Sequence, residues 1–443
     1  MNTNTFFHSV TLDKDKCKGC INCIKRCPTE AIRVRNKKAM IIPERCIDCG
    51  ECIRVCPHHA KKAIYDSLDV LDQFEYTIAL PAPSLYAQFN HLEDVEIVLR
   101  ALLELGFDSV YEVAKAAELV SDATRHYMAR PDILKPVISS ACPAVTRLIR
   151  VRFPSLIDHV LPFNAPVEVA ARLSKKDAAK RTGLPMEKIG AIFISPCPAK
   201  VTASKMPLGT GKSAVSAVVA ISEVYPKLLK HMHADLTSEA PTAQSGKIGV
   251  SWASSSGEAS ALLNDNYLAA DGIENVIRVL EDLEDEKFEN LDFIELNACN
   301  AGCIGGVMTV ENPYIARTKL KRLRKYLPVS LNHAEQIDAE LNWDAPLEYT
   351  PVLKLDEDFS VAMEKMTEME QIEQSLPGLD CGSCGSPTCR ALAEDVVRGL
   401  ASPDECIFKF RENITALVDG IHKLDGYIPH SLRGEKEDEH DPD

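Results

Sequence analysis

Short apolar runs recur through the middle of the chain, from about residue 75 to residue 350, and each is followed by a loop and then by apolar residues at helical spacing. We predict a β-strand over each of the clearest runs. These runs are YTIAL (76–80), PVIS (136–139), AIFIS (191–195), KIGVSW (247–252) and FIELN (293–297). Because strands alternate with helical segments, this region predicts an α/β fold with mostly parallel sheets.

The flanking regions have different patterns. Residues from about 10 to 66 form a pseudo-repeat with cysteines in each half, and VAMEKMTEMEQIEQ (361–374) is a polar helical segment. The final residues, RGEKEDEHDPD, have the composition of a disordered tail. We predict a cysteine-rich module at 1–70, an α/β domain at 71–355, a small helical domain at 356–425 and an acidic tail at 426–443.

Composition restricts the class of protein. The formal net charge of −15 argues against a nucleic-acid partner. The first residues, MNTNTFFHSV, lack a leader pattern, and no apolar stretch reaches transmembrane length. We therefore predict a cytoplasmic protein with no membrane insertion, and in that reducing compartment closely spaced cysteines indicate metal sites rather than disulfides.

The first module is locally basic. Its lysines and arginines form either an ordinary solvated surface or a docking patch for an acidic redox partner. These residues are Lys14, Lys16, Lys18, Lys25, Arg26, Arg33, Arg35, Lys37 and Lys38.

All sixteen cysteines fall into four sets of four. The first two sets have the spacing C-x2-C-x2-C-x3-C-P, which is the pattern of bacterial two-cluster ferredoxins. In that pattern the fourth cysteine of each run binds the other cluster. One [4Fe-4S] cluster is then predicted on Cys17, Cys20, Cys23 and Cys56, and another on Cys46, Cys49, Cys52 and Cys27. A pair of zinc sites is the alternative, but zinc knuckles seldom pack cysteines so densely.

The third set is Cys142, Cys197, Cys299 and Cys303, and its members follow three of the predicted strands. Since sites in open α/β sheets form at the carboxyl ends of strands, we expect these thiols to converge on one buried cluster. A single buried cysteine is more often a small core residue. That alternative does not account for four cysteines in SSACPAV, SPCPAK and ELNACNAGCIGG.

These three segments resemble the signature motifs of [FeFe]-hydrogenases (iron-only hydrogenases), in the same order and at similar separations. The resemblance covers the ferredoxin-like module and the middle region, and it implies a two-lobed H-domain with parallel sheets. It also implies the H-cluster: a cubane on Cys142, Cys197, Cys299 and Cys303, with Cys303 bridging to a two-iron subcluster that carries CO, cyanide and azadithiolate. In the family, Ala82, Pro83, Ser84 and Lys200 would surround the cyanide ligands.

The chain departs from the family at the proton-handling positions. Active hydrogenases have a proton-shuttling cysteine before the first cluster ligand, where this chain has Ala141, and Ser195 and Asn297 replace two methionines of the pocket. SDATRH (121–126) offers no convincing equivalent of the usual acidic path. Loss of a positioned proton relay typically costs about 10²–10⁴-fold in rate. Glu295 is either a relay acid or a strand-end residue with a structural hydrogen bond.

The last set, Cys381, Cys384, Cys389 and Cys406, has the spacing C-x2-C-x4-C-x16-C. ALAEDVVRG is predicted to be a helix whose start is capped by Cys389. The segment resembles the four-iron domain of corrinoid iron–sulfur proteins, with zinc as the alternative metal. By contrast, GTGKS (209–213) lacks the first glycine and the preceding strand of a phosphate loop, so we reject nucleotide binding.

Together these features resemble the sensory branch of the [FeFe]-hydrogenases, found in anaerobes. The hypothesis is an H2 or redox sensor of low hydrogenase activity, with an H-cluster and three further [4Fe-4S] clusters. Its partners would be H2 and protons, a ferredoxin-like or other redox protein, a separate signalling protein and the H-cluster maturation proteins. The alternatives are a ferredoxin-coupled catalytic hydrogenase or subunit of a larger redox complex, and a non-catalytic iron–sulfur scaffold without the two-iron subcluster.

Overall fold

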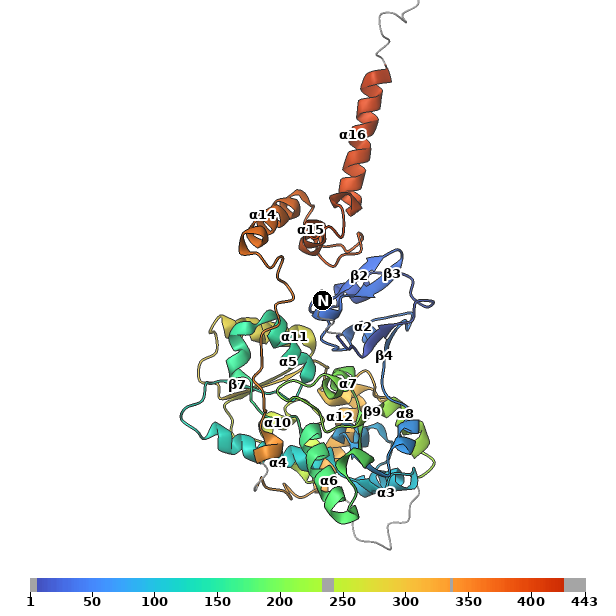
Figure 1. Ribbon diagram of the computed structural model, residues 1–443, viewed down its shortest axis with the longest axis vertical. Helices are drawn as coiled ribbons and strands as arrows, with labels where there is room; N and C mark the ends of the chain where they lie inside the picture. Colours follow the sequence, from blue (N-terminus) through green and yellow to red (C-terminus); the bar gives the residue numbers. More distant parts are fainter. Residues whose placement is uncertain (1–5, 233–242, 335–337, 426–443) are drawn as a thin grey trace, which may run out of the picture. The chain divides into compact units, whose positions relative to one another are not determined.

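A computed structural model describes residues 6–232, 243–334 and 338–425 of the chain (Figure 1). The chain divides into two compact units, Met1–Leu353 and Lys354–Asp443. The predicted disordered tail lies outside the described residues. No helix in the described ranges is long and apolar enough to span a membrane.

The first unit begins with a small two-part module. Strands β1 and β4 pair antiparallel, as do β2 and β3, and each of two one-turn helices follows a cysteine-rich loop. The elements are β1 (Val10–Leu12), α1 (Asn22–Lys25), β2 (Ile32–Arg35), β3 (Lys38–Ile41), α2 (Glu51–Arg54) and β4 (Lys61–Ala63). Their small core combines apolar side chains with cysteines of both sets, so the thiols lie inside the module.

The rest of the first unit contains two parallel sheets, as predicted. One has the strand order β6-β5-β8-β9 and the other β10-β11-β7. The strands are β5 (Tyr76–Pro81), β6 (Ser109–Val110), β7 (Val137–Ile138), β8 (Ile189–Ser195), β9 (Ala217–Ala220), β10 (Tyr267–Asp271) and β11 (Phe293–Asn297). The strands predicted at 76–80, 136–139, 191–195 and 293–297 are therefore confirmed as β5, β7, β8 and β11.

Helices cover both faces of the four-stranded sheet. Along β8, Ile192 and Ile194 belong to one apolar core, while Ala191 and Phe193 belong to the other. This alternation follows from the two-residue period of a strand, and burial on both faces is why the run is almost wholly apolar. The helices of this unit with eight or more residues are α3 (Val95–Glu104), α4 (Val113–Met128), α5 (Pro143–Arg152), α6 (Pro166–Thr182), α7 (Pro198–Lys205), α8 (Ile221–Leu228), α11 (Ile273–Glu284) and α12 (Pro313–Leu323).

The prediction of a strand at 247–252 is wrong. The segment forms α9 (Lys247–Ser251), which packs against α4. A Cβ on Gly249 would lie 2.0 Å from the carbonyl oxygen of Ala114, so glycine is what allows this close approach. Alternating polar and apolar residues over so few positions do not distinguish a strand from one turn of helix.

The second unit is helical, as predicted. It contains α14 (Phe359–Ser375), α15 (Cys389–Val397) and α16 (Ile407–Asp425). The residue that caps α15 differs from the prediction, because the Thr388 hydroxyl accepts a hydrogen bond from the Ala391 amide while Cys389 occupies the first helical position. A threonine hydroxyl is a stronger acceptor for an amide than a thiol, and this leaves the Cys389 sulfur available to a metal.

We expect Gly249→Ala to lower the free energy of unfolding by about 1–3 kcal/mol, because the added methyl group forces α9 away from α4. Denaturant unfolding of the metal-loaded protein measures the change. Gly211→Ala is the matched control, since no heavy atom lies within 4 Å of the Cβ it adds. Equal stability of the two variants would contradict the close packing of α9.

Candidate functional site

The structure gathers the cysteines of the first module into the two crossed sets. Cys17, Cys20, Cys23 and Cys56 line one small cavity, and Cys27, Cys46, Cys49 and Cys52 line a second. The two crossing ligands have equivalent surroundings. The Ala31 amide donates to the Cys27 sulfur at 3.2 Å, and the Ala60 amide donates to the Cys56 sulfur at 3.3 Å.

The charges around these cavities fit an anionic metal cluster. Burial raises the pKa of Cys23 to about 11 and that of Cys52 to about 12, so the thiols ionise only when a metal compensates for the lost hydration. Lys61 lies close enough to oppose both shifts, and its side chain is buried. Its ammonium nitrogen has no hydrogen-bond partner among the described residues. A buried cation of this kind is stabilised by the negative charge of thiolate-bound clusters.

The third set of cysteines converges from both sheets of the first unit. Cys142 follows β7 and is the N-cap residue of α5, whereas Cys197 follows β8 and is the N-cap residue of α7. Cys299 and Cys303 both follow β11. Helix N-termini carry partial positive charge, so α5 and α7 favour anionic sulfur at their first turns.

The four thiols of this third set are mutually close. Burial raises the pKa of Cys299 well above its usual range, and the neighbouring thiols of Cys197, Cys142 and Cys303 raise it further. The positive charge of Arg54 has the opposite effect and lowers this pKa. Cys49 of the first module packs against the same apolar core as Cys142 and Cys197. The second ferredoxin-like site therefore adjoins the central one.

Lys200 supplies the positive charge at this centre. Its ammonium group donates to the Cys303 sulfur at 3.6 Å. Burial alone would lower the pKa of Lys200, but the thiols of Cys303, Cys197 and Cys142 raise it above its usual range. Lys200 thus stays protonated beside sulfur.

A cavity adjoins Cys303, and most of the predicted pocket residues line it. They are Ala82, Pro83, Ser84, Ala141, Cys142, Lys200, Asn297 and Cys303. The Ser84 hydroxyl is fully buried and has no hydrogen-bond partner among the described residues. A buried unpaired hydroxyl beside a buried ammonium fits a ligand that brings acceptor atoms, as the diatomic ligands of an H-cluster would.

Ser195, another predicted pocket residue, is not among the residues that line this cavity. Its hydroxyl donates to the Cys197 carbonyl at 3.1 Å and accepts from the Cys197 amide at 3.2 Å. Ser195 ends β8, and its hydroxyl satisfies the backbone at the turn into α7. The serine therefore positions a cysteine ligand instead of facing the cavity.

Two buried carboxylates line the same cavity, and the sequence indicated only one of them. The Ser139 hydroxyl donates to Glu258 at 2.6 Å, and the Ala141 amide donates to the Ser139 oxygen at 3.2 Å. Glu295 accepts from the Ser256 and Ala259 amides and from the Asn297 side chain. Glu295 therefore makes structural hydrogen bonds at the end of its strand and also lines the cavity, where a relay acid would lie.

The pKa of each of these two carboxyls is raised, mainly by burial, and the charge of Glu295 raises that of Glu258 further. Ionisation of these two carboxyls is therefore less favourable than that of isolated carboxyls in water. Glu258 lies in the Ser/Gly-rich segment SSSGEAS, which carries no recognisable motif, and this is why sequence analysis did not find it.

The residues of the segment SDATRH (121–126) are not among those that line the cavity. Ser121 accepts from the Trp252 indole at 2.9 Å and donates to the Ala117 carbonyl, and Thr124 donates to the Val120 carbonyl. Asp122 instead pairs with Arg125 at 2.6 Å.

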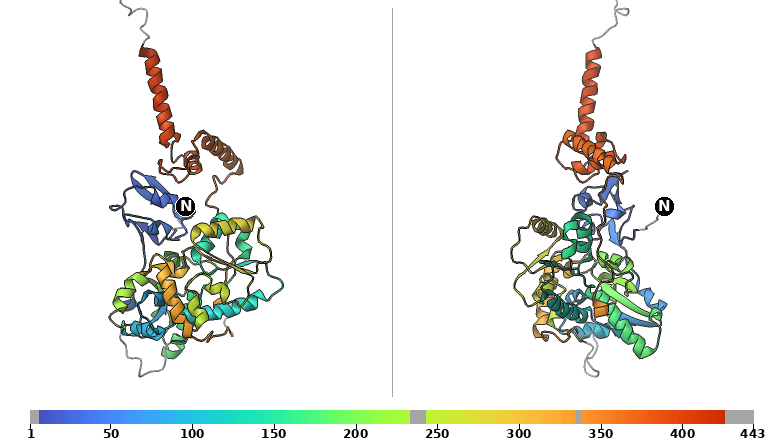
Figure 2. Two further views of the ribbon diagram at one scale, coloured as in Figure 1. Left: turned by 180° about the vertical axis from the view of Figure 1, so that it is seen from behind. Right: turned by 60° about the vertical axis from the view of Figure 1, so that its left-hand side comes forward.

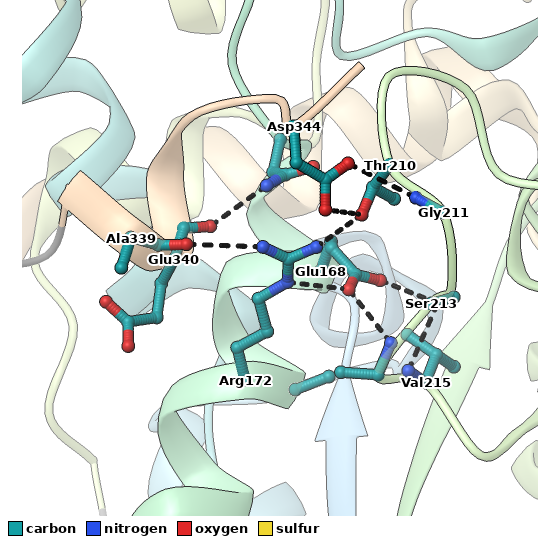
Figure 3. A network of polar contacts seen from close by, with 12 residues as sticks. Glu168, Arg172, Thr210, Gly211, Ser213, Val215, Ala339, Glu340 and Asp344 are labelled. Atoms are coloured by element: carbon teal, nitrogen blue, oxygen red, sulfur yellow. Dashed lines mark hydrogen bonds and ion pairs between the residues drawn. The ribbon is translucent and has the colours of Figure 1, made fainter.

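A second, largely apolar cavity shares Lys200 and Phe193 with the site. A polar network stands at its wall (Figure 3). Glu168 accepts from Arg172 at 2.9 Å and from Ser213 at 2.6 Å, and Arg172 donates to Thr210 at 2.7 Å. The GTGKS segment is thus hydrogen-bonded to the carboxylates of Glu168 and Asp344.

The fourth set of cysteines lies in the second unit. Cys384, Cys389 and Cys406 surround the small core formed with Leu376 and Leu392. Burial raises the pKa of Cys384, and the thiols of Cys381 and Cys406 add to the shift. The thiols of Cys381 and Cys406 thus lie near that of Cys384, and Cys389 packs against the same small core.

Comparison with known proteins identifies the family. The iron only hydrogenase large subunit, C-terminal domain, matches residues 75–267 and 255–307, which together cover more than half of the 443 residues. The chain belongs to the iron-only hydrogenase family. A 4Fe-4S dicluster domain matches residues 9–57, and an Fe-S cluster domain matches residues 376–408. This hydrogenase-like chain is therefore an iron–sulfur protein.

Two curated relatives match parts of the hydrogenase-like chain. The NADP-reducing hydrogenase subunit HndD of Solidesulfovibrio fructosivorans is 27% identical over 146 residues, 30% of this chain and 25% of the relative. The cytosolic Fe-S cluster assembly factor nar1 of Aspergillus terreus is 28% identical over 109 residues, 25% of this chain and 17% of the relative. The matched segments span a quarter or less of each relative's length.

Solved structures of [FeFe]-hydrogenases also match. The [FeFe]-hydrogenase HydA1 from Chlamydomonas reinhardtii is 15% identical, with a TM-score of 0.45 over 62% of this chain and 95% of its own. A HydA structure that reveals stepwise H-cluster assembly gives the same values.

We expect Lys61→Met to lower the midpoint potentials of both clusters in the first module, because a buried positive charge stabilises the reduced, more negative state. Redox titration followed by electron paramagnetic resonance measures the potentials. The neighbouring Lys62→Met is the control, since Lys62 is half exposed and pairs with Asp13 at 2.8 Å. Indistinguishable potentials in the two variants would show that Lys61 does not act on the clusters.

Proposed function

We propose that this protein binds H2 at an H-cluster and oxidises or produces it slowly, with electrons relayed through [4Fe-4S] clusters, as an H2 or redox sensor. The observation that carries the proposal is the cavity beside Cys303, where a protonated lysine and an unpaired buried serine hydroxyl face the same space as the cluster thiols. Such a lining is suited to a ligand with several acceptor atoms beyond a simple cubane.

The residues have separate tasks in this proposal. Cys142, Cys197, Cys299 and Cys303 would hold the cubane, and Lys200 and Ser84 would donate to acceptor ligands in the cavity. When bound, the H-cluster supplies the redox and acid–base chemistry that splits H2. The cysteine sets of the first module would carry electrons away, since Cys49 adjoins the core around Cys142 and Cys197.

The slow rate is inferred from the proton-handling residues. Ala141 cannot accept or donate a proton through its side chain, and Ser139 and Glu258 form the nearest hydrogen-bonded acid beside it. Because Glu258 and Glu295 are buried together, they share a proton rather than ionise independently. We infer that protons reach the cavity through this pair.

A second candidate is a non-catalytic iron–sulfur scaffold. The similarity to the assembly factor nar1, which extends over a quarter of this chain, supports this candidate. A scaffold has no need of a protonated lysine and a paired acid around a cavity, so the lining favours H2 binding. A ferredoxin-coupled catalytic hydrogenase would share that lining but turn over quickly. Hydrogenase assays of the fully matured protein separate these two.

Protein matured with the two-iron complex should show infrared bands from CO and cyanide, because Ser84 and Lys200 give such ligands hydrogen-bond donors. Lys200→Met should shift the cyanide bands or abolish them, while Lys205→Met, an exposed lysine of the same helix, should leave them unchanged. Absence of both kinds of band from wild-type protein with a full complement of iron would favour the scaffold.

Glu258→Gln should lower H2 turnover by about 10²-fold, since glutamine cannot pass on a proton, and Glu258→Asp should retain more of the activity. The same substitution should raise the melting temperature relative to wild type, increasingly so as the pH rises from about 4, the ordinary pKa of glutamate. The sign follows because a raised pKa in the folded protein means that stability is lost as the carboxyl is forced to ionise. Thermal unfolding at several pH values measures this, and a pH-independent difference would contradict a buried acid at this position.

A further inference from the structure

The last described helix, α16, carries an apolar seam that the rest of its unit does not cover. The seam consists of Ile407, Phe410, Ile414, Leu417, Ile421 and Leu424, and the side chains of these six residues are 46–69% exposed. Successive members are three and four residues apart in strict alternation. This is the spacing of the a and d positions of a coiled-coil heptad.

The seam is confined to one side of the helix. Lys409, Glu412, Asp419 and Lys423 stand at heptad positions c and f, away from it, and Lys409 pairs with Glu412 at 3.1 Å. A surface helix that packs on its own domain usually has a wider apolar face, buried against that domain. A narrow and exposed a/d stripe indicates packing against another helix.

α16 is anchored at its first turn to the fourth cysteine set. Cys406 immediately precedes the helix, its carbonyl accepts from the Phe410 amide at 2.8 Å, and Phe408 packs with the small core of the unit. Figures 1 and 2 show α16 projecting as a single helix away from α14 and α15. The helix is therefore fixed at one end and presents its seam along its length.

We propose that α16 pairs with α16 of a second copy of this chain in a parallel two-stranded coiled coil. The seam has isoleucine at every a position and leucine or phenylalanine at every d position. β-Branched residues at a and leucine at d favour two parallel strands over higher oligomers. An identical helix provides the same pattern in register.

The charges beside the seam allow this self-association. In a parallel pair, each g position faces the next e position of the partner helix. Among the residues whose side chains the structure describes, g positions Cys406 and Asn413 face e positions Arg411 and Val418. None of these pairs carries like charges, so two identical helices approach without repulsion.

The parallel arrangement places the two Cys406 residues at the same end of the coiled coil. The fourth cysteine sets of the two copies would thus be held close to each other. The contact has twofold symmetry, so association would stop at the dimer. This proposal rests on α16 alone and does not depend on the proposed function.

Analytical ultracentrifugation of the full-length, metal-loaded protein over a dilution series tests the proposal. Wild-type protein should show twice the mass of one chain and dissociate on dilution. The Leu417→Lys variant should have the mass of one chain over the same dilution series. A coiled coil of this variant would bury one lysine from each copy in the seam, and this destabilises the dimer. Lys423→Glu, a charge change away from the seam, should associate like wild type.

Iron content and circular dichroism should be the same in all three proteins, which separates lost association from lost folding. If Leu417→Lys does not fold, Leu417→Ala is a milder second seam variant, which should dissociate at higher protein concentration than wild type. Wild-type protein with the mass of one chain throughout would overturn the proposal and leave a different protein as the partner of the seam. A dimer that both seam variants retain as strongly as wild type would overturn it as well, because the contact would then lie elsewhere.

Discussion

Four thiols that converge in a buried site lose their hydration and, once ionised, repel one another, so they cannot stay ionised there without cationic metal between them. Burial raises the pKa of Cys142 and Cys299, and it raises that of Cys197 to about 12. Metal binding must therefore release the thiol protons, and its free energy becomes part of the folding free energy. The same constraint applies to the first module, where cysteines of both sets are packed into its small apolar core. Cluster assembly and folding are coupled throughout the chain.

The fold meets this constraint with backbone and side-chain charge placed near the sulfur atoms. Cys142 and Cys197 each begin a helix, so the amide dipoles of α5 and α7 favour negative charge at the centre. Lys200 follows Cys197 by one turn of α7, and one short helix thus supplies a thiol and an ammonium to the same site. Lys61 has the corresponding position in the first module, between cysteines of both sets. Both lysines are held by electrostatic attraction to sulfur, so neither is expected to keep its position without bound metal.

Sequence analysis predicted what depends on periodicity and spacing. The long apolar run of β8 is buried on both faces, and Cys142, Cys197, Cys299 and Cys303 follow strand ends, so both features could be read from local pattern. What it missed depends on tertiary contacts. Alternation at 247–252 indicated a strand, but Gly249 allows α9 to pack closely on α4. Ser195 turns to the Cys197 backbone, and Glu258 reaches the cavity from a loop without a motif; neither direction is encoded in nearby residues.

In the proposed function, the chain offers more groups for electron transfer to the central site than for proton transfer. The first module holds two cysteine sets, and Cys49 of one set packs against the same apolar core as Cys142 and Cys197. Among the described residues that line the cavity, the carboxyl groups are those of Glu258 and Glu295, and the side chain before the first cluster ligand is the methyl group of Ala141. Because each carboxylate of the pair raises the free energy of ionising the other, proton release by the pair is costly at neutral pH. Proton delivery, rather than electron supply, would then limit turnover, and a centre limited in this way reports the presence of H2 while consuming little of it.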